Sequence, residues 1–302
     1  MMLRRVLPLL AAAALLAGAA APEAFASPGP SPSGTVTKGS TGSAAKGTRV
    51  WWWVPQREDG KRPPVVVVVH GFSALDPALY GATIAHLWRE GYAVIYPQFQ
   101  RADAGFITES DQNVFLRRAV ETTNHALDIL GDSVDRSDLV VYGHSLGGLI
   151  ASVWNPAGGS RARAAVLANP STATEVPANV PVEITPIPVE TLAPQVDIPV
   201  FILTGNDDRI APPSQSTDLW ALLTGAPVRE VWMARTDYRG LPPVRADHVA
   251  PLNFANGIAY GVLDKRYYQG ALDQAISGAT TLTFYLGSRP LTGPIRPPVR
   301  LR

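Results

Sequence analysis

Cysteine is absent from this chain of 302 residues. Its absence excludes disulfide bonds, thiolate metal sites, a cysteine nucleophile and a lipid anchor attached to cysteine. The chain also lacks charge excess, because its formal net charge is +1 and no overall field attracts nucleic acid or anionic lipid. Motifs for a zinc protease site, a phosphate-binding loop and a dinucleotide site are missing as well. We therefore expect no metal, no cofactor and no nucleic-acid partner.

The first 26 residues have the pattern of a secretory signal peptide. An arginine pair at positions 4 and 5 precedes an apolar run over 6–21, and Ala24-Phe25-Ala26 supplies the small residues that signal peptidase accepts. The run is short for a membrane span of about 20 residues, and Pro8 interrupts it. We expect cleavage after Ala26, a secreted protein and no stable membrane anchor.

Composition separates the next segment from the rest of the chain. Residues 27–47 are rich in Ser, Gly, Pro and Thr and show no apolar period, which predicts a disordered linker. Residues 48–302 then form one domain, since α/β folds of about 250 residues often fold as a unit.

Strands and helices alternate after residue 48. Runs of β-branched or aromatic residues predict strands, and apolar residues at helical spacing predict helices. The predicted strands cover 50–54, 65–69, 93–96, 138–142, 164–168, 199–204 and 228–233, and the predicted helices cover 79–90, 110–130, 146–154, 215–223 and 263–276. The pattern predicts an α/β fold with a mostly parallel central sheet, helices on both faces and the tryptophan-rich first strand at an antiparallel edge. The proline-rich segment 171–198 is interpreted as a cap or lid insertion before strand 199–204.

The sharpest local motif lies between a predicted strand and a predicted helix. Residues 143–147 read Gly-His-Ser-Leu-Gly and match G-x-S-x-G. Such a serine sits on a tight, strained turn, and the glycines two residues before and after it let neighbouring backbone approach. The motif predicts that Ser145 is a nucleophile.

A single histidine is available as the general base. In proteins with this motif the chain order is serine, acid, histidine, and His248 is the only histidine beyond the motif. The other four are interpreted otherwise: His144 lies inside the motif, His70 orders a loop, and His86 and His125 are structural or exposed residues of helices.

The acid is expected in the turn after strand 199–204. Residues 205–210 read Gly-Asn-Asp-Asp-Arg-Ile, and a G-x-x-D pattern before an apolar residue favours Asp208. Asp207 is the competing choice and otherwise a turn residue. Asp247, beside His248, is a third and less favoured candidate.

Two backbone N–H groups are candidates for an oxyanion hole. The N–H of Leu146 follows the nucleophile directly, at the start of a helix. The turn after strand 65–69 begins with His70-Gly71, and we assign the second donor to Phe72, with Ser73 as the neighbouring option.

These motifs together resemble the α/β-hydrolase superfamily over about residues 48–265. The resemblance extends to secreted bacterial esterases and lipases, and the His70–Phe72 loop with the serine motif is also similar to cutinase-like polyesterases. It implies an esterase, lipase or related acyl hydrolase that works through an acyl-serine intermediate. The chain departs from secreted cutinases in having no cysteine pair, and in the added segment 171–198 and the long tail after His248.

The leading hypothesis is therefore a secreted serine hydrolase that cleaves carboxylic esters with Ser145, His248 and Asp208. Its partner would be a small-molecule or lipid-like ester, and we expect a monomer. Acyl transfer, peptide cleavage and polyester cleavage use the same residues and stay open as alternatives. A secreted binding protein that keeps the fold without catalysis is the alternative of a different class.

Overall fold

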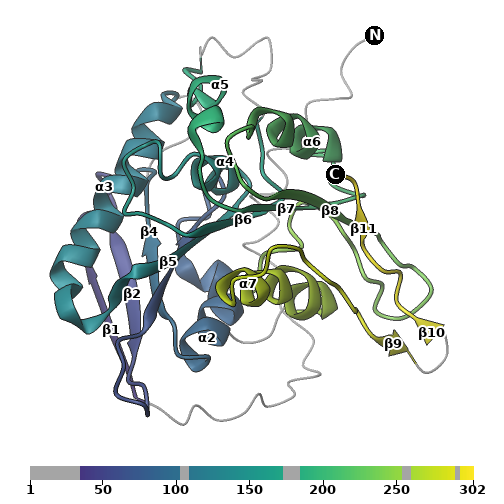
Figure 1. Ribbon diagram of the computed structural model, residues 1–302, viewed down its shortest axis with the longest axis horizontal. Helices are drawn as coiled ribbons and strands as arrows, with labels where there is room; N and C mark the ends of the chain where they lie inside the picture. The colour runs from purple at the N-terminus through teal and green to yellow at the C-terminus, as the bar shows by residue number, and fades with distance from the viewer. Residues whose placement is uncertain (1–34, 103–108, 173–183, 254–259, 290–292) are drawn as a thin grey trace.

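A nine-stranded sheet forms the centre of the computed structural model, which describes residues 35–102, 109–172, 184–253, 260–289 and 293–302. The strand order is β1-β2-β4-β3-β5-β6-β7-β8-β11 (Figure 1). The strands are β1 (Val36–Thr41), β2 (Val50–Pro55), β3 (Pro64–Val69), β4 (Ala93–Pro97), β5 (Asp135–His144), β6 (Ala164–Ala168), β7 (Val200–Gly205), β8 (Arg229–Ala234) and β11 (Val299–Arg300). A short antiparallel pair, β9 (Ser288–Arg289) and β10 (Gly293–Pro294), stands apart from this sheet.

The middle of the sheet is parallel, from β4 through β3, β5, β6 and β7 to β8. Both edges are antiparallel, with β2 against β4 on one side and β11 against β8 on the other. The predicted mostly parallel sheet is confirmed. The tryptophan-rich strand β2 is antiparallel as predicted, but its predicted place at the edge is wrong because β1 pairs along its outer side.

The prediction of a disordered linker over 27–47 is wrong for residues 36–41, which form β1. This strand is largely polar and contains no buried residue, so its own sequence carries little strand signal. Its backbone pairs with β2, and the Trp52 ring lies so close to Gly39 that an added Cβ would meet the ring at 2.5 Å. Tertiary pairing thus outweighs the local composition. The predicted signal peptide and the start of the linker lie outside the described residues.

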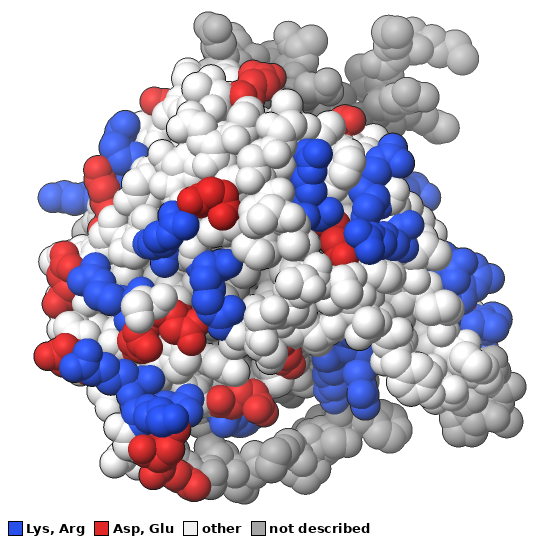
Figure 2. Space-filling view, viewed as in Figure 1, with Lys and Arg blue, Asp and Glu red and all other residues white. Residues whose placement is uncertain are grey.

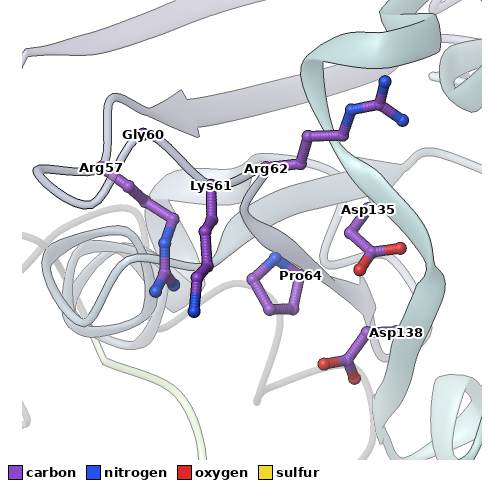
Figure 3. Close-up of a pocket in the computed structure, with 7 residues that line it drawn as sticks. All are labelled: Arg57, Gly60, Lys61, Arg62, Pro64, Asp135 and Asp138. Atoms are coloured by element: carbon purple, nitrogen blue, oxygen red, sulfur yellow. The ribbon is translucent and has the colours of Figure 1, made fainter.

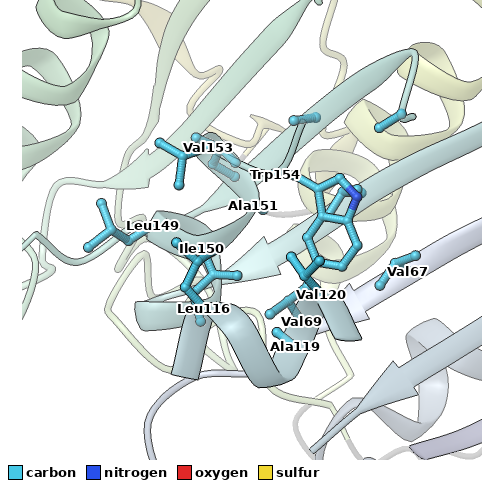
Figure 4. Packing of buried hydrophobic residues seen from close by; sticks show 14 of the residues in the cluster. Val67, Val69, Leu116, Ala119, Val120, Leu149, Ile150, Ala151, Val153 and Trp154 are labelled. Carbon is cyan, nitrogen blue, oxygen red and sulfur yellow. The ribbon is translucent and has the colours of Figure 1, made fainter. Parts of the chain in front are cut away.

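Helices cover both faces of the sheet, as predicted (Figure 1). Helices α3 (Gln112–Leu130), α4 (Leu146–Ser152), α5 (Val189–Leu192) and α6 (Pro213–Leu222) lie on one face, and α2 (Gly81–Arg89) and α7 (Gln269–Ile276) lie on the other. Strand β3 alternates between the two cores, since Val65, Val67 and Val69 pack on one face and Val66 and Val68 on the other. Figure 4 shows side chains of β3, α3 and α4 packed together in the first core.

The helix predicted over 263–276 begins as a wide π-helical turn, η5 (Asp264–Tyr268), and continues as α7. Tyr267 and Tyr268 are both buried, and their hydroxyls reach the sheet: Tyr267 donates to the Trp232 carbonyl at 2.6 Å. Long-range hydrogen bonds of this kind stabilise an irregular turn that the sequence pattern does not reveal.

Residues 184–198, the second described part of the predicted cap, pack into the first core. Ile187, Ala193, Val196 and Ile198 are buried there. The sequence did not predict this packing, because prolines hide the short helix α5 and the buried positions around it. The interpretation of 171–198 as a cap or lid stays a prediction. Residues 173–183 of this segment lie outside the described residues.

The chain after α7 returns to the sheet. The Glu230 carboxylate of β8 is 1% exposed and accepts hydrogen bonds from Trp232, Thr281 and Leu282. Arg300 of β11 forms an ion pair with the same carboxylate at 3.1 Å. These contacts attach residues 281, 282 and 300 to β8. Among the described helices, none is long and apolar enough to cross a membrane.

Candidate active site

Ser145 occupies a strained turn between β5 and α4. Its φ of 55° and ψ of −122° lie in a region that L-residues rarely adopt. A Cβ at Gly143 would meet the Gly147 carbonyl oxygen at 2.1 Å, and a Cβ at Gly147 would meet the Val69 oxygen at 2.2 Å. Both glycines are therefore required by close backbone approach, as the motif predicted.

The structure brings Ser145, His248 and Asp208 together in one hydrogen-bonded row. His248 Nε2 lies 2.9 Å from Ser145 Oγ, and His248 Nδ1 lies 2.8 Å from Asp208 Oδ2. A carboxylate only accepts hydrogen bonds, so Nδ1 carries the proton and Nε2 is left to accept from the serine hydroxyl. The exposed fractions are 7% for Ser145, 9% for His248 and 3% for Asp208. The row is thus largely shielded from solvent.

The three aspartates that the sequence left open occupy different places. Asp208 Oδ2 accepts a hydrogen bond from the His248 ring. Asp208 Oδ1 accepts hydrogen bonds from the N–H groups of Ile210 at 2.9 Å and Ala211 at 2.7 Å. Asp207 points elsewhere and accepts from Tyr238 and Thr236, which lower the pKa of its carboxyl. Burial raises the pKa of the Asp247 carboxyl. Only Asp208 has its carboxylate on the imidazole.

The predicted oxyanion loop packs directly against the serine turn. A Cβ at Gly71 would lie 3.2 Å from the Ser145 Cβ. Leu146 is the first residue of α4, so its N–H has no carbonyl of its own helix to bond. The Ser73 N–H, the alternative candidate for the second donor, donates to the Gln100 side chain at 2.7 Å. The assignment of Phe72 as the second donor stays a prediction.

His70 lies behind this loop. It is 0% exposed, its Nδ1–H donates to the Gly71 carbonyl at 2.7 Å, and its ring stacks on Phe99 with centroids 4.0 Å apart. Burial lowers the pKa of His70 to about 4, so the ring is neutral at pH 7. This placement agrees with the interpretation of His70 as a residue that orders the loop.

Sequence reasoning missed several buried polar residues around the site. Gln100, which supports the Ser73 backbone, follows the carboxyl end of β4, and Asn169 follows the carboxyl end of β6. Polar residues just after buried parallel strands were the available signal, because these strand ends meet at one edge of the sheet. Tyr80 gave no signal, since an aromatic residue before a helix is ordinary core.

Charged residues gather at the opposite edge, away from Ser145. Arg57, Lys61 and Arg62 border a hollow with Asp135 and Asp138 at the amino ends of β3 and β5 (Figure 3). Charges of both signs are also interspersed over much of the face in Figure 2. The described residues contain no cluster of three or more His, Asp or Glu that could hold a metal ion.

The family of the chain follows from comparison with known proteins. Residues 53–229, more than half of the chain, match the model of the dienelactone hydrolase family. The matched segment includes Ser145 and Asp208 and ends before His248. No curated protein matches the chain. The chain therefore belongs to the dienelactone hydrolase family, whose members are hydrolases of the α/β-hydrolase superfamily.

Proposed function

We propose that this hydrolase cleaves carboxylic esters through an acyl-serine intermediate, with Ser145 as nucleophile, His248 as general base and Asp208 as the acid that orients it. The observation that carries the proposal is the continuous row from Ser145 Oγ through the His248 ring to the Asp208 carboxylate. A serine hydroxyl is a weak nucleophile until a neighbouring base removes its proton.

The chemistry runs in two balanced steps. Ser145 Oγ attacks the ester carbonyl carbon while its proton passes to His248 Nε2, and the same proton then leaves with the alcohol as the ester bond breaks. In the second step His248 takes a proton from water, whose oxygen attacks the acyl group. That proton returns to Ser145 Oγ as the acid product departs.

Asp208 and the oxyanion donors support the charges that develop in these steps. The Asp208 carboxylate keeps the His248 ring in the tautomer that accepts from serine and stabilises the imidazolium. The N–H groups of Leu146 and Phe72 are assigned to the carbonyl oxygen, and each such donor contributes about 3 kcal/mol of transition-state stabilisation.

The proposed substrate class is supported by exposed apolar residues that lie close in sequence to the proposed acid and base. Ile210 and Val249 are 37% and 45% exposed, two residues after Asp208 and one after His248. Exposed apolar side chains beside a reactive group favour a small-molecule or lipid-like ester with an apolar part. The proposal includes no nucleic-acid partner and no membrane partner, and the protein is proposed to act as a monomer.

A fluorophosphonate probe tests the catalytic proposal, because it labels only an activated serine. Wild type should be labelled, and the variants Ser145→Ala and His248→Ala should not, while circular dichroism shows that all three are folded. Folded wild type without labelling would refute the serine-hydrolase proposal and favour a binding protein.

A series of p-nitrophenyl esters of increasing acyl length then tests the substrate class. We expect kcat/KM to rise from acetate to medium-chain esters. Added alcohol or a peptide substrate separates acyl transfer and peptide cleavage from hydrolysis. A flat or falling series would contradict the apolar part of the proposal.

Secretion is proposed separately, from residues 1–26. Expression of the full chain in a bacterial host with a general secretion pathway should release a protein whose first residue is Ser27. N-terminal sequencing of the released protein checks this, and a retained uncleaved chain would contradict it.

A further inference from the structure

The carbonyl oxygen of His248 is held by two buried side chains from other parts of the sheet. His144 Nε2 lies 2.9 Å from this oxygen, and Asn169 Nδ2 lies 3.2 Å from it. Asn169 Nδ2 also donates to the carbonyl of Asp247 at 2.9 Å. His144 is 3% exposed and Asn169 is 0% exposed. Neither side chain takes part in the steps proposed above.

The direction of these hydrogen bonds is determined by the chemistry of the groups. A carbonyl only accepts, so His144 Nε2 carries a proton, and Nδ1 accepts from the Tyr80 hydroxyl at 2.8 Å. The Tyr80 oxygen in turn accepts the Gly71 N–H at 2.9 Å. Burial, followed by the nearby His248, lowers the pKa of His144 to about 3, so the ring is neutral as this pattern requires.

The resulting chain of hydrogen bonds connects three parts of the site. It begins at Gly71, the residue before Phe72, and passes through Tyr80 and His144 to the main chain of His248. His144 is also the residue next to Ser145. One imidazole therefore joins the oxyanion loop, the serine turn and the segment of the base.

Asn169 is the second donor to the His248 carbonyl. It follows β6 with a φ of 46°, and its N–H donates to the Leu203 carbonyl at 2.7 Å, which attaches it to β7. Its Oδ1 accepts from Tyr268 at 3.3 Å, so its amide is oriented with Nδ2 toward residues 247 and 248. His248 otherwise follows a long irregular segment that supplies no regular hydrogen-bonding ladder.

We propose that His144 and Asn169 are positioning residues that hold the His248 main chain so that its ring stays between Ser145 and Asp208. The inference rests on the proposed function for its effect on catalysis, but the hold on the main chain exists whether or not the protein hydrolyses esters. Loss of the His144 donor should leave substrate binding intact and misplace the base. A misplacement of about 1 Å lowers kcat by about 100-fold.

The test compares two replacements of one residue in the full domain. His144→Phe keeps a ring of similar size without the donor, and His144→Gln keeps an N–H₂ group near the position of Nε2. We expect His144→Phe to lower kcat on a p-nitrophenyl ester by about 100-fold with KM within about twofold, and His144→Gln to recover most of the loss. His125→Gln, on the exposed face of α3, is the surface control and should match wild type.

Two further readouts separate positioning from simple loss of folding. The final extent of fluorophosphonate labelling counts folded sites, so kcat per labelled site should still fall in His144→Phe. Hydrogen exchange of a peptide covering 245–250 should be about tenfold faster in His144→Phe than in wild type, and unchanged in His144→Gln.

The outcomes separate the proposed function from the positioning role of His144. Wild type that is inactive and unlabelled, with faster exchange confined to His144→Phe, would overturn the proposed function and leave the positioning role standing. Active wild type with unchanged exchange in His144→Phe, or with equal kcat per labelled site, would overturn the positioning role and leave the proposed function standing.

Discussion

The proposed nucleophile and the proposed base are held in place by different means. Ser145 lies between β5 and α4, where two glycines, a buried strand and a helix start determine its backbone. His248 lies on an irregular segment, and its position depends on side chains from distant parts of the chain, chiefly Asp208, His144 and Asn169. The first arrangement is local in sequence and sterically rigid. The second is assembled from long-range hydrogen bonds, so it can be weakened one contact at a time.

The largest expected effect is on the base side. Asp208→Asn keeps the size of the side chain but no longer holds the proper tautomer of His248, so kcat/KM on an ester should fall by about 10⁴-fold. Asp207→Asn is the matched control, because its carboxylate accepts hydrogen bonds from Tyr238 and Thr236 rather than from the His248 ring, and it should change kcat/KM by no more than about threefold. A larger loss for Asp207→Asn would reverse the assignment of the acid.

A substitution in the turn that holds Ser145 should instead lower the stability of the protein through a steric clash. In Gly147→Ala the added Cβ meets the backbone oxygens of Val69 and His70 at 2.2 and 2.3 Å, so the free energy of unfolding should fall by about 3 kcal/mol. Urea denaturation measures this. Gly270→Ala, in α7 with its nearest contact at 3.7 Å, should instead stabilise by about 0.5–1 kcal/mol. Equal effects of the two substitutions would contradict steric control of the serine turn.

The buried His70, behind the predicted oxyanion loop, should make the free energy of unfolding depend on pH. Its pKa is lowered from 6.5 to about 4 in the folded protein, so unfolding takes up a proton below pH 6.5 and stability falls as the pH drops toward 4. In His70→Asn the difference in unfolding free energy between pH 7.5 and pH 5 should shrink by about 2 kcal/mol relative to wild type. Urea titrations at the two pH values test this, and an unchanged difference would show that His70 is not neutral in the folded state.

The smallest expected change in unfolding free energy comes from a substitution that loosens the segment before His248. The Thr236 hydroxyl donates to Asp207 at 3.0 Å and accepts the Ala246 N–H at 3.0 Å, so Thr236→Val should cost about 1–2 kcal/mol of unfolding free energy. Thr204→Val is its matched control, because within the described chain the buried Thr204 hydroxyl has no hydrogen-bond partner. The control should be neutral or slightly stabilising. Two equal losses would show that the Thr236 bonds contribute nothing specific.

The comparison also explains which predictions from the sequence succeeded. The ends of the parallel core strands were predicted to within three residues, because strands buried on both faces must be nearly continuous apolar runs. The edge strand β1 was misread as linker, and the packing of segment 184–198 was not predicted. Both owe their structure to neighbours far away in the chain: β2 for the first and the α3–α4 core for the second.

By itself, the sequence determined the alternating α/β pattern, the serine turn with its obligatory glycines, and the single histidine beyond that turn. These features depend on local sterics and on apolar periodicity, which are written directly in the order of residues. Only the tertiary structure placed the Asp208 carboxylate rather than that of Asp207 on the His248 ring, bound the Gln100 side chain to the Ser73 N–H, and brought His144 and Asn169 to the His248 carbonyl. These contacts join residues up to 104 positions apart, and they form because the ends of the parallel strands meet at one edge of the sheet.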